Sequence, residues 1–195
     1  DDLALAGVVR LVALCGAPTP VVRRLLDLLD DALHVTAAGE LADVRLSVQR
    51  AASTQETLLM SGGKTAAYSF QLPLQMAAVL AGSDEETLDR LGRFGWLLGT
   101  AFQLRDDLHG MFDETTRTGK PALSDLREGK DTVLITIART TSEWEQIAPY
   151  VGRPVLTEDE TALVRGLLER CGARAAVERI ACELAEQAAD AVAGL

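Results

Sequence analysis

The chain has 195 residues, of which 48% are hydrophobic and only 4% aromatic, and its formal net charge is −10. A composition dominated by alanine and leucine favours helices over strands. The acidic charge argues against binding to nucleic acid or to an anionic membrane surface. No stretch reaches the ~18 uninterrupted apolar residues typical of a membrane-spanning helix, so no stable membrane insertion is expected.

Three cysteines, Cys15, Cys171 and Cys182, form an odd set without CxxC spacing. This pattern predicts reduced, buried thiols in a cytoplasmic protein. Asp1 begins inside an apolar helical pattern, and we therefore expect the natural N-terminus to lie further upstream.

The hydrophobic period is helical almost throughout, so a single all-α domain is predicted over residues 1–195. The first helix is expected over Asp2–Cys15 and the second over residues 20–50, with Gly39 as a weak point. Gly62-Gly63 is expected to separate a short helix from one over residues 64–81. Residues 116–130 are predicted to be the only substantial non-helical segment, and the last helix begins near Ala173. The S/T-x-x-E capping box predicts four helix starts, at Ser53–Glu56, Ser83–Glu86, Ser142–Glu145 and Thr157–Glu160.

The most informative segment is Phe94–Met111, which is apolar or small on every face before Gln103 and then carries Asp106 and Asp107. Such a helix is expected to be buried, and buried charges must be paired or hold a metal. Aspartate oxygens suit Mg²⁺, which shares its coordination with water and substrate phosphates. The alternative is a solvated acidic stripe, which continues through Gly110, Asp113 and Glu114.

Two basic segments accompany this acidic helix. Thr118-Gly119-Lys120-Pro121 and Arg127-Glu128-Gly129-Lys130 follow it and suit a polyphosphate next to a metal; the alternative is a charged surface loop. Gly63-Lys64-Thr65 is expected at a helix N-terminus, where free N–H groups favour an anion, although the P-loop pattern is absent and a plain helix start is the simpler interpretation.

Two weaker features complete the candidates. Glu40 and Asp43, within Gly39-Glu40-Leu41-Ala42-Asp43, share a helix face, an arrangement that often serves solubility alone. His34 and His109 lack the spacing of metal ligands, and both are expected to be structural histidines.

These segments and their order resemble the trans-isoprenyl diphosphate synthases, the polyprenyl synthase family. FQLRDDLHGMFDE with the following TGKP and SDLREGK is similar to the family's second aspartate-rich motif and phosphate-binding loop. KTAAYSFQLPLQ resembles its Lys-Thr segment, and GELAD its Gly-Gln-x-x-Asp segment, with Glu40 where glutamine is usual. The tail GARAAVERIACELAEQAADAV also resembles the family, so the likeness extends over nearly the whole chain.

The resemblance implies an isoprenoid-synthase-type helical bundle around a central cavity, usually a homodimer. It implies a Mg²⁺-dependent transferase that joins an allylic diphosphate to isopentenyl diphosphate and gives a longer, geranylgeranyl-like product. Carried over by position, Asp106 and Asp107 would be Mg²⁺ ligands and, with Lys64, the catalytic residues. The residues that would contact the allylic diphosphate are Lys64, Thr65, Gln103, Lys120 and, more weakly, Lys130.

Two departures from the family pattern stand out. Gly110 occupies the third position of the second DDxxD motif, which leaves open whether Asp113 assists one turn later. The first aspartate-rich motif is absent and is expected upstream, so that residues 1–195 would be the C-terminal two-thirds of a synthase domain. The alternatives are an inactive subunit that partners a complete synthase, and a terpene cyclase that ionises a prenyl diphosphate on the same fold.

Overall fold

A computed structural model describes residues 2–49, 52–113 and 123–195, and every regular element in these ranges is a helix. The prediction of an all-α bundle is confirmed. The helices are α1 (Asp2–Ala13), α2 (Thr19–Gln49), α3 (Thr54–Ser61), the π-helix η1 (Gly62–Gln71), α4 (Leu72–Ala81), α5 (Glu85–Phe112), α7 (Ser124–Glu128), α8 (Val133–Ala138), α9 (Trp144–Ile147), the 3₁₀-helix η2 (Ala148–Tyr150), α10 (Glu158–Arg170) and α11 (Ala173–Val192).

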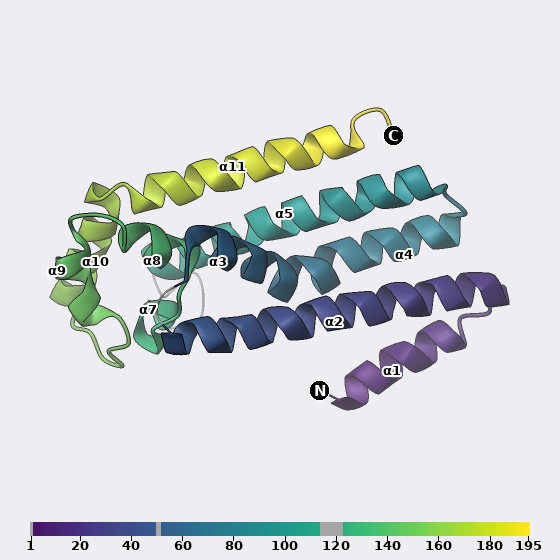
Figure 1. Cartoon of the computed structure of the whole chain (residues 1–195), viewed down its shortest axis with the longest axis horizontal. Helices are drawn as coiled ribbons and strands as arrows, with labels where there is room; N and C mark the ends of the chain where they lie inside the picture. Colours follow the sequence, from purple (N-terminus) through teal and green to yellow (C-terminus); the bar gives the residue numbers. More distant parts are fainter. Residues whose placement is uncertain (1, 50–51, 114–122) are drawn as a thin grey trace.

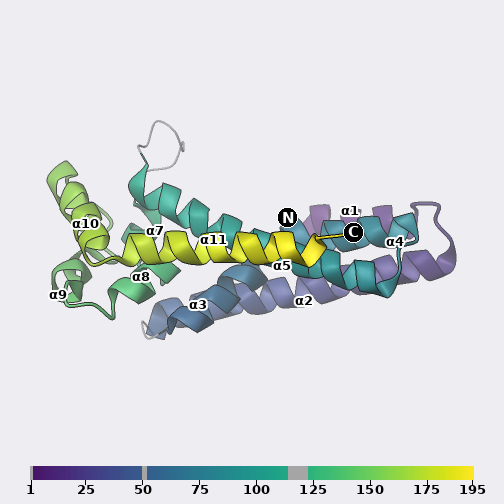
Figure 2. The same ribbon diagram turned by 90° about the horizontal axis from the view of Figure 1, so that it is seen from above.

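The long helices lie side by side, and α5 is at the centre of their packing. It contacts α11 on one side and η1 and α4 on the other, while α2 packs against η1 and α4. In Figure 1 these helices run roughly horizontally, and the short elements α7 to α10 gather at one end. The view from above shows α11 extending along α5 (Figure 2). No helix in the described ranges is both long and apolar enough to cross a membrane.

Glycines allow α5 and η1 to pack unusually closely. A Cβ at Gly95 would lie 2.6 Å from the Cα of Gln71, and a Cβ at Gly99 would lie 2.6 Å from the Cβ of Ala66. Both distances are too short for a real side chain, so glycine is required for this approach. Because the helices meet here, the residues that follow along α5 lie next to the residues that open η1.

The expected break at Gly62-Gly63 is wrong, because α3, η1 and α4 follow one another without an intervening loop. Tertiary packing explains Gly62 instead, because a Cβ there would lie 2.6 Å from the Trp96 ring; a Cβ at Gly63 would meet its nearest atom at 3.4 Å, an ordinary contact. Gly39 is not a weak point either, since α2 continues through it and a Cβ there would lie 2.7 Å from the backbone nitrogen of Lys64. These glycines fit closely packed helices rather than a chain break.

Two of the four predicted capping boxes are confirmed. Ser53 and Thr157 each accept a hydrogen bond from the backbone N–H of the glutamate three residues later, and the side chain of that glutamate accepts one from the backbone N–H of the cap residue. The other two predictions are wrong. Asp84 caps α5 by accepting from Thr87 N at 2.9 Å, so Ser83 is not the cap, and Ser142 bonds the neighbouring Glu143 instead of capping α9.

The end of α5 is fixed by an apolar core and by one arginine. Leu104, Leu108 and Met111 pack with buried side chains of α7, α8, α10 and α11. Arg165 of α10 donates hydrogen bonds to the carbonyl oxygens of Met111 at 2.7 Å and Asp113 at 2.9 Å. A cation at these carbonyls satisfies the free end of the helix, and it holds the turn that follows Asp106 and Asp107 in place.

Three further expectations need correction. Residues 116–130 are not wholly non-helical, because α7 lies within them; residues 114–122, including Glu114, are outside the described ranges. The cysteines are free but not all buried, since Cys15 and Cys182 are exposed. The helix carrying the aspartate pair is not buried on every face, because Phe102 is 55% exposed.

Candidate active site

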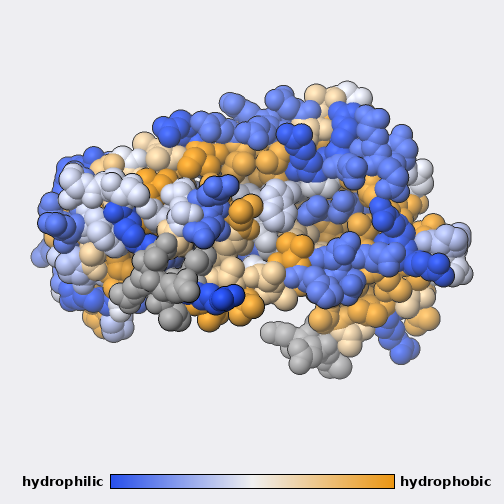
Figure 3. Space-filling model, in the orientation of Figure 1, coloured by the Kyte–Doolittle hydropathy of each residue, from blue (hydrophilic) through white to orange (hydrophobic). Residues whose placement is uncertain are grey.

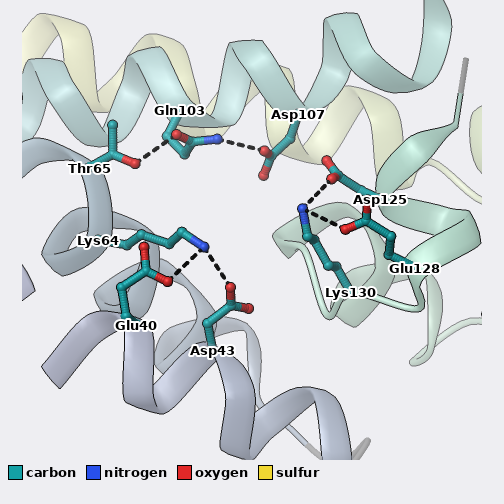
Figure 4. A network of polar contacts seen from close by, with 9 residues as sticks. All are labelled: Glu40, Asp43, Lys64, Thr65, Gln103, Asp107, Asp125, Glu128 and Lys130. Carbon is teal, nitrogen blue, oxygen red and sulfur yellow. Dashed lines mark hydrogen bonds and ion pairs between the residues drawn. The ribbon is translucent and has the colours of Figure 1, made fainter. Parts of the chain in front are cut away.

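A cavity of about 400 Å³ opens beside the C-terminal half of α5. Side chains from α2, η1, α5, α7 and the loop after α7 point into a common space (Figure 4). The described residues that line it are Asp43, Met60, Ser61, Lys64, Thr65, Gln103, Asp106, Asp107, His109, Gly110, Ser124, Asp125, Lys130, Asp131 and Thr132.

Lys64 reaches this cavity from η1 and is held by the acidic face of α2. Its Nζ lies 2.7 Å from Oδ2 of Asp43 and 3.1 Å from Oε2 of Glu40. Burial lowers the pKa of Lys64, but its hydrogen bonds to the two carboxylates outweigh burial and raise the pKa above the usual lysine value. Glu40 and Asp43 therefore orient a permanently charged ammonium group at the cavity.

The expectation that Lys64 and Thr65 lie at a helix N-terminus is wrong. They occupy η1, in the middle of a continuous helical stretch, so their backbone N–H groups are not the free donors of a helix start. A π-helix is a strained form that recurs at functional sites. Here any contact of Lys64 or Thr65 with an anion must come from the side chains.

Thr65, Gln103 and Asp107 form a short chain of hydrogen bonds across η1 and α5. Thr65 Oγ1 donates to Gln103 Oε1 at 2.8 Å, and Gln103 Nε2 donates to Asp107 Oδ1 at 2.8 Å. The first contact fixes which end of the Gln103 amide faces Asp107. The chain thus holds one oxygen of Asp107 in position and leaves the other for a ligand.

The two adjacent aspartates differ in environment. Asp106 is exposed, whereas Asp107 is partly buried. Burial, together with the negative charges of Asp125 and Asp106, raises the pKa of Asp107 to about 7, despite the opposing hydrogen bond from Gln103. A carboxylate in this position is stabilised by a cation in the cavity.

Lys130 lies in the loop after α7, where the chain turns through Gly129 at φ 72°. Its Nζ lies 2.8 Å from Oδ1 of Asp125 and 3.1 Å from Oε2 of Glu128. These contacts outweigh burial and raise the pKa of Lys130 above the usual lysine value. The sequence identified the lysine but not Asp125, whose only signal was its place five residues earlier in the same SDLREGK segment.

Asp131 is a cavity residue that sequence reasoning missed. It is only 2% exposed and forms an ion pair with Arg139. Its Oδ2 is buried and has no hydrogen-bond partner among the described residues. No spacing or motif in the sequence distinguishes this aspartate from a surface residue.

Gly110 lines the cavity but has no side chain to contribute to it, and a Cβ at this residue would meet nothing within 4 Å. Asp113 does not take its place. Its Oδ2 lies 2.9 Å from Nδ1 of His109, and Asp113 is not among the cavity-lining residues. His109, which we expected to be merely structural, does line the cavity.

The donor set fits a hard divalent cation. Five aspartates and two lysines line the described cavity, so acidic groups are in excess and an anion needs additional positive charge there. Carboxylate oxygens are preferred ligands of Mg²⁺. Within the described ranges no three acidic, histidine or cysteine side chains converge as a ready-made metal cluster, so water and phosphate oxygens would supply the remaining ligands.

The structure therefore brings together six of the seven predicted site residues, from three separate parts of the chain. These are Lys64, Thr65, Gln103, Asp106, Asp107 and Lys130. The seventh, Lys120, lies outside the described residues.

Comparison with known proteins gives a consistent picture. The family model for polyprenyl synthetase matches residues 3–162. A (2E,6E)-farnesyl diphosphate synthase of Mycobacterium bovis is 32% identical over 167 residues, which cover 83% of this chain and 46% of the relative. A geranylgeranyl diphosphate synthase of Mycobacterium tuberculosis is 32% identical over 74% of this chain and 42% of its own length. The chain thus spans less than half the length of these relatives.

Solved structures agree with the sequence relatives. A geranylgeranyl pyrophosphate synthase from Corynebacterium glutamicum, complexed with isoprenyl diphosphate and magnesium, superposes with a TM-score of 0.88 at 30% identity; the match covers 98% of this chain and 55% of that one. A polyprenyl synthetase from Streptomyces coelicolor gives 0.87 at 28% identity, with 98% and 59% covered.

Proposed function

The chain belongs to the polyprenyl synthetase family, and we propose that its cavity binds the diphosphate of an allylic substrate through Mg²⁺. The protein then condenses that substrate with isopentenyl diphosphate to give a longer, geranylgeranyl-like trans-prenyl diphosphate. One observation carries this proposal: the carboxylates of Asp106 and Asp107 line the same cavity as the lysines of two distant elements, Lys64 and Lys130. Acidic groups for a metal and basic groups for phosphate are what a metal–diphosphate complex requires.

The residues would divide the work as follows. Asp106 and Asp107 hold the divalent cation, and Gln103 keeps Asp107 oriented through its 2.8 Å hydrogen bond. Lys64 and Lys130 contact phosphate oxygens as point charges, and the family resemblance implies the same role for Lys120. When bound, the cation supplies positive charge that stabilises the diphosphate as it leaves.

The reaction creates positive charge on the allylic carbon, which water would capture. The described lining of the cavity is polar apart from Met60 and Gly110. The hydrocarbon part of the substrate would therefore lie beyond this lining, against apolar side chains that exclude water. The family resemblance implies that the released diphosphate removes the proton after carbon–carbon bond formation.

Three parts of the proposal concern the whole protein: its domain, its oligomeric state and its location in the cell. Residues 1–195 would form the C-terminal part of a synthase domain, with the first aspartate-rich motif in an upstream segment. The family resemblance implies that two copies would form a homodimer. The apolar side chains of α1, of which Leu5, Val8, Val9 and Leu11 are all at least 40% exposed, would be covered by the upstream segment or by the second copy. Figure 3 shows apolar surface over the α1–α2 end of the molecule. A cytoplasmic location accords with the three free cysteines.

Turnover of the Asp106→Ala variant tests the site. The proposal expects a loss of several orders of magnitude relative to the unmodified protein, with the fold retained by circular dichroism. An unchanged rate would contradict the assignment. Incubation with allylic diphosphates shorter than the geranylgeranyl chain, and with geranylgeranyl diphosphate itself, each with and without isopentenyl diphosphate, tests the reaction: a synthase elongates a shorter allylic diphosphate only when isopentenyl diphosphate is present, whereas a cyclase forms hydrocarbon from a prenyl diphosphate alone.

A further inference from the structure

The two lysines that line the candidate active site are held in the same way, each by one inner and one outer carboxylate. Nζ of Lys64 lies 2.7 Å from Asp43, which lines the cavity, and 3.1 Å from Glu40, which is outside the lining. The side chain of the aspartate is 16% exposed and that of the glutamate 54%. Asp43 thus fixes the ammonium group at the cavity wall, while Glu40 approaches it from a more exposed position.

Lys130 repeats this arrangement across the cavity (Figure 4). Its Nζ lies 2.8 Å from Asp125, a lining residue, and 3.1 Å from Glu128, which is 60% exposed and outside the lining. An ammonium group has three N–H donors, so one donor of each lysine remains for a ligand once its two carboxylates are satisfied. Each lysine together with its two carboxylates carries a formal net charge of −1.

We propose that Glu40 and Glu128 make the cavity selective for a diphosphate complexed with a divalent cation over the free diphosphate anion. Each glutamate leaves one N–H of its lysine able to donate a hydrogen bond, but it offsets the positive charge that would otherwise attract a free anion. This role rests on the proposed function and specifies the form of the diphosphate that the site accepts.

The negative charge of the two lysine groups explains the selectivity. The energy between two charges is proportional to their product, and free pyrophosphate carries several negative charges, so these groups repel it strongly. A divalent cation neutralises much of that charge, and the repulsion becomes small while the hydrogen bonds from the lysines remain. Because Glu40 and Glu128 are more than half exposed, their ion pairs contribute little to folding, and their main effect is on the charge at the cavity.

Calorimetric titration with inorganic pyrophosphate, once with the metal-free protein and once with saturating Mg²⁺, tests the proposal. Glu40→Gln keeps an oxygen that accepts from Lys64 but removes the negative charge. The variant should bind metal-free pyrophosphate about fivefold more tightly than the unmodified protein, whereas its affinity for the Mg²⁺ complex should change by a smaller factor. Glu128→Gln should have the same effect through Lys130, and the double variant should show the largest gain.

A gain in affinity separates this role from a merely structural one, because a loss of lysine orientation would weaken the binding of both forms of pyrophosphate. The matched control is Glu85→Gln. Glu85 pairs with Arg24 at 2.9 Å on the surface and lies at the start of α5, at the opposite end of that helix from the cavity. The control removes the same charge and should leave both affinities unchanged; a gain equal to that of Glu40→Gln would overturn the proposal, because overall net charge would then determine the affinity.

The possible failures are distinguishable. If the unmodified protein binds pyrophosphate with Mg²⁺ but the double variant shows no gain for the metal-free anion, the role of the two glutamates is refuted and the proposed function stands. The same conclusion follows if the unmodified protein binds pyrophosphate equally well with and without Mg²⁺. If the unmodified protein does not bind pyrophosphate even with saturating Mg²⁺, the proposed function fails as well.

Discussion

The side-chain amide of Gln103 donates a hydrogen bond of 2.8 Å to Oδ1 of Asp107, and its carbonyl accepts one of the same length from Thr65. Because both ends of the amide are engaged, Gln103 links η1 to the acidic part of α5. A partly buried carboxylate with a single oriented donor is prepared to receive a cation on its other oxygen.

Replacing Gln103 with Leu tests this link. We expect turnover to fall by about tenfold or more, because a hydrogen bond to a charged group contributes ~1.5–3 kcal/mol. The Mg²⁺ concentration at half-maximal rate should rise, since Asp107 loses its orientation. Gln146→Leu, at an exposed position of α9, is the control and should leave both quantities unchanged. Equal Mg²⁺ requirements for the Gln103 variant and the unmodified protein would contradict the link.

The raised pKa of Asp107 predicts how stability changes with pH in the absence of metal. The folded state has a pKa of about 7 at this carboxyl, against ~3.9 for an unfolded aspartate. The folded protein therefore retains a proton that the unfolded chain releases, and the free energy of unfolding should decrease as pH rises from about 4 to 7.

Asp107→Asn removes this dependence. The variant should gain stability over the unmodified protein as pH rises from 4 to 8, by at most ~4 kcal/mol. Thermal unfolding at the two pH values, with chelator present, measures the gain. Asp106→Asn, which replaces an exposed aspartate beside Asp107, is the matched control for the loss of one charge. Added Mg²⁺ should raise the Tm of the unmodified protein at pH 8 more than that of Asp107→Asn; a flat pH profile would refute the account.

Lys64 provides a prediction about ligand affinity. Lys64→Ala should weaken binding of inorganic pyrophosphate with Mg²⁺ by about tenfold or more, because a charge-assisted contact is lost. Arg24→Ala is matched in charge change, since Arg24 pairs with Glu85 at 2.9 Å on the surface and does not line the cavity. Calorimetry should show little effect for Arg24→Ala. An equal effect of both variants would mean that net charge alone matters.

The close approach of α2 and η1 at Gly39 predicts that two Gly→Ala variants differ in their free energy of unfolding. In Gly39→Ala the new Cβ would lie 2.7 Å from the backbone nitrogen of Lys64, and such overpacking costs about 1–3 kcal/mol. Gly110→Ala meets no atom within 4 Å and gains up to ~1 kcal/mol of helix propensity. Denaturant unfolding should therefore separate the two variants in opposite directions; similar stabilities would contradict the packing.

The sequence predicted helix starts correctly where they depend only on interactions between residues close together in the chain. Ser53 and Thr157 begin helices because their hydroxyl groups and the glutamates three residues later form complete capping boxes. At Ser83 the same pattern failed because Asp84, one residue later, is a strong cap in its own right. The break predicted at Gly62-Gly63 is wrong, because the close approach of the Trp96 ring to Gly62 is a tertiary contact that the sequence does not display.

In the candidate site, too, residues in local motifs could be predicted from the sequence, and residues brought there by tertiary folding could not. Lys64, Gln103, Asp106 and Asp107 could be named because they lie in motifs with family spacing. Asp125 and Asp131 could not, because their relation to the cavity depends on how α7 and the following loop fold back onto α5. The exposure of Phe102 also depends on which surfaces other segments cover, and the apolar run before Gln103 carried no information about that.

The central claim is that the cavity beside α5 binds a metal–diphosphate complex. A crystal structure of the protein with Mg²⁺ and a non-reactive allylic diphosphate analogue tests it most directly. We predict Mg²⁺ on the carboxylates of Asp106 and Asp107, with the diphosphate between the ammonium groups of Lys64 and Lys130. A cavity that remains empty under these conditions, or a diphosphate bound elsewhere on the molecule, would contradict the account.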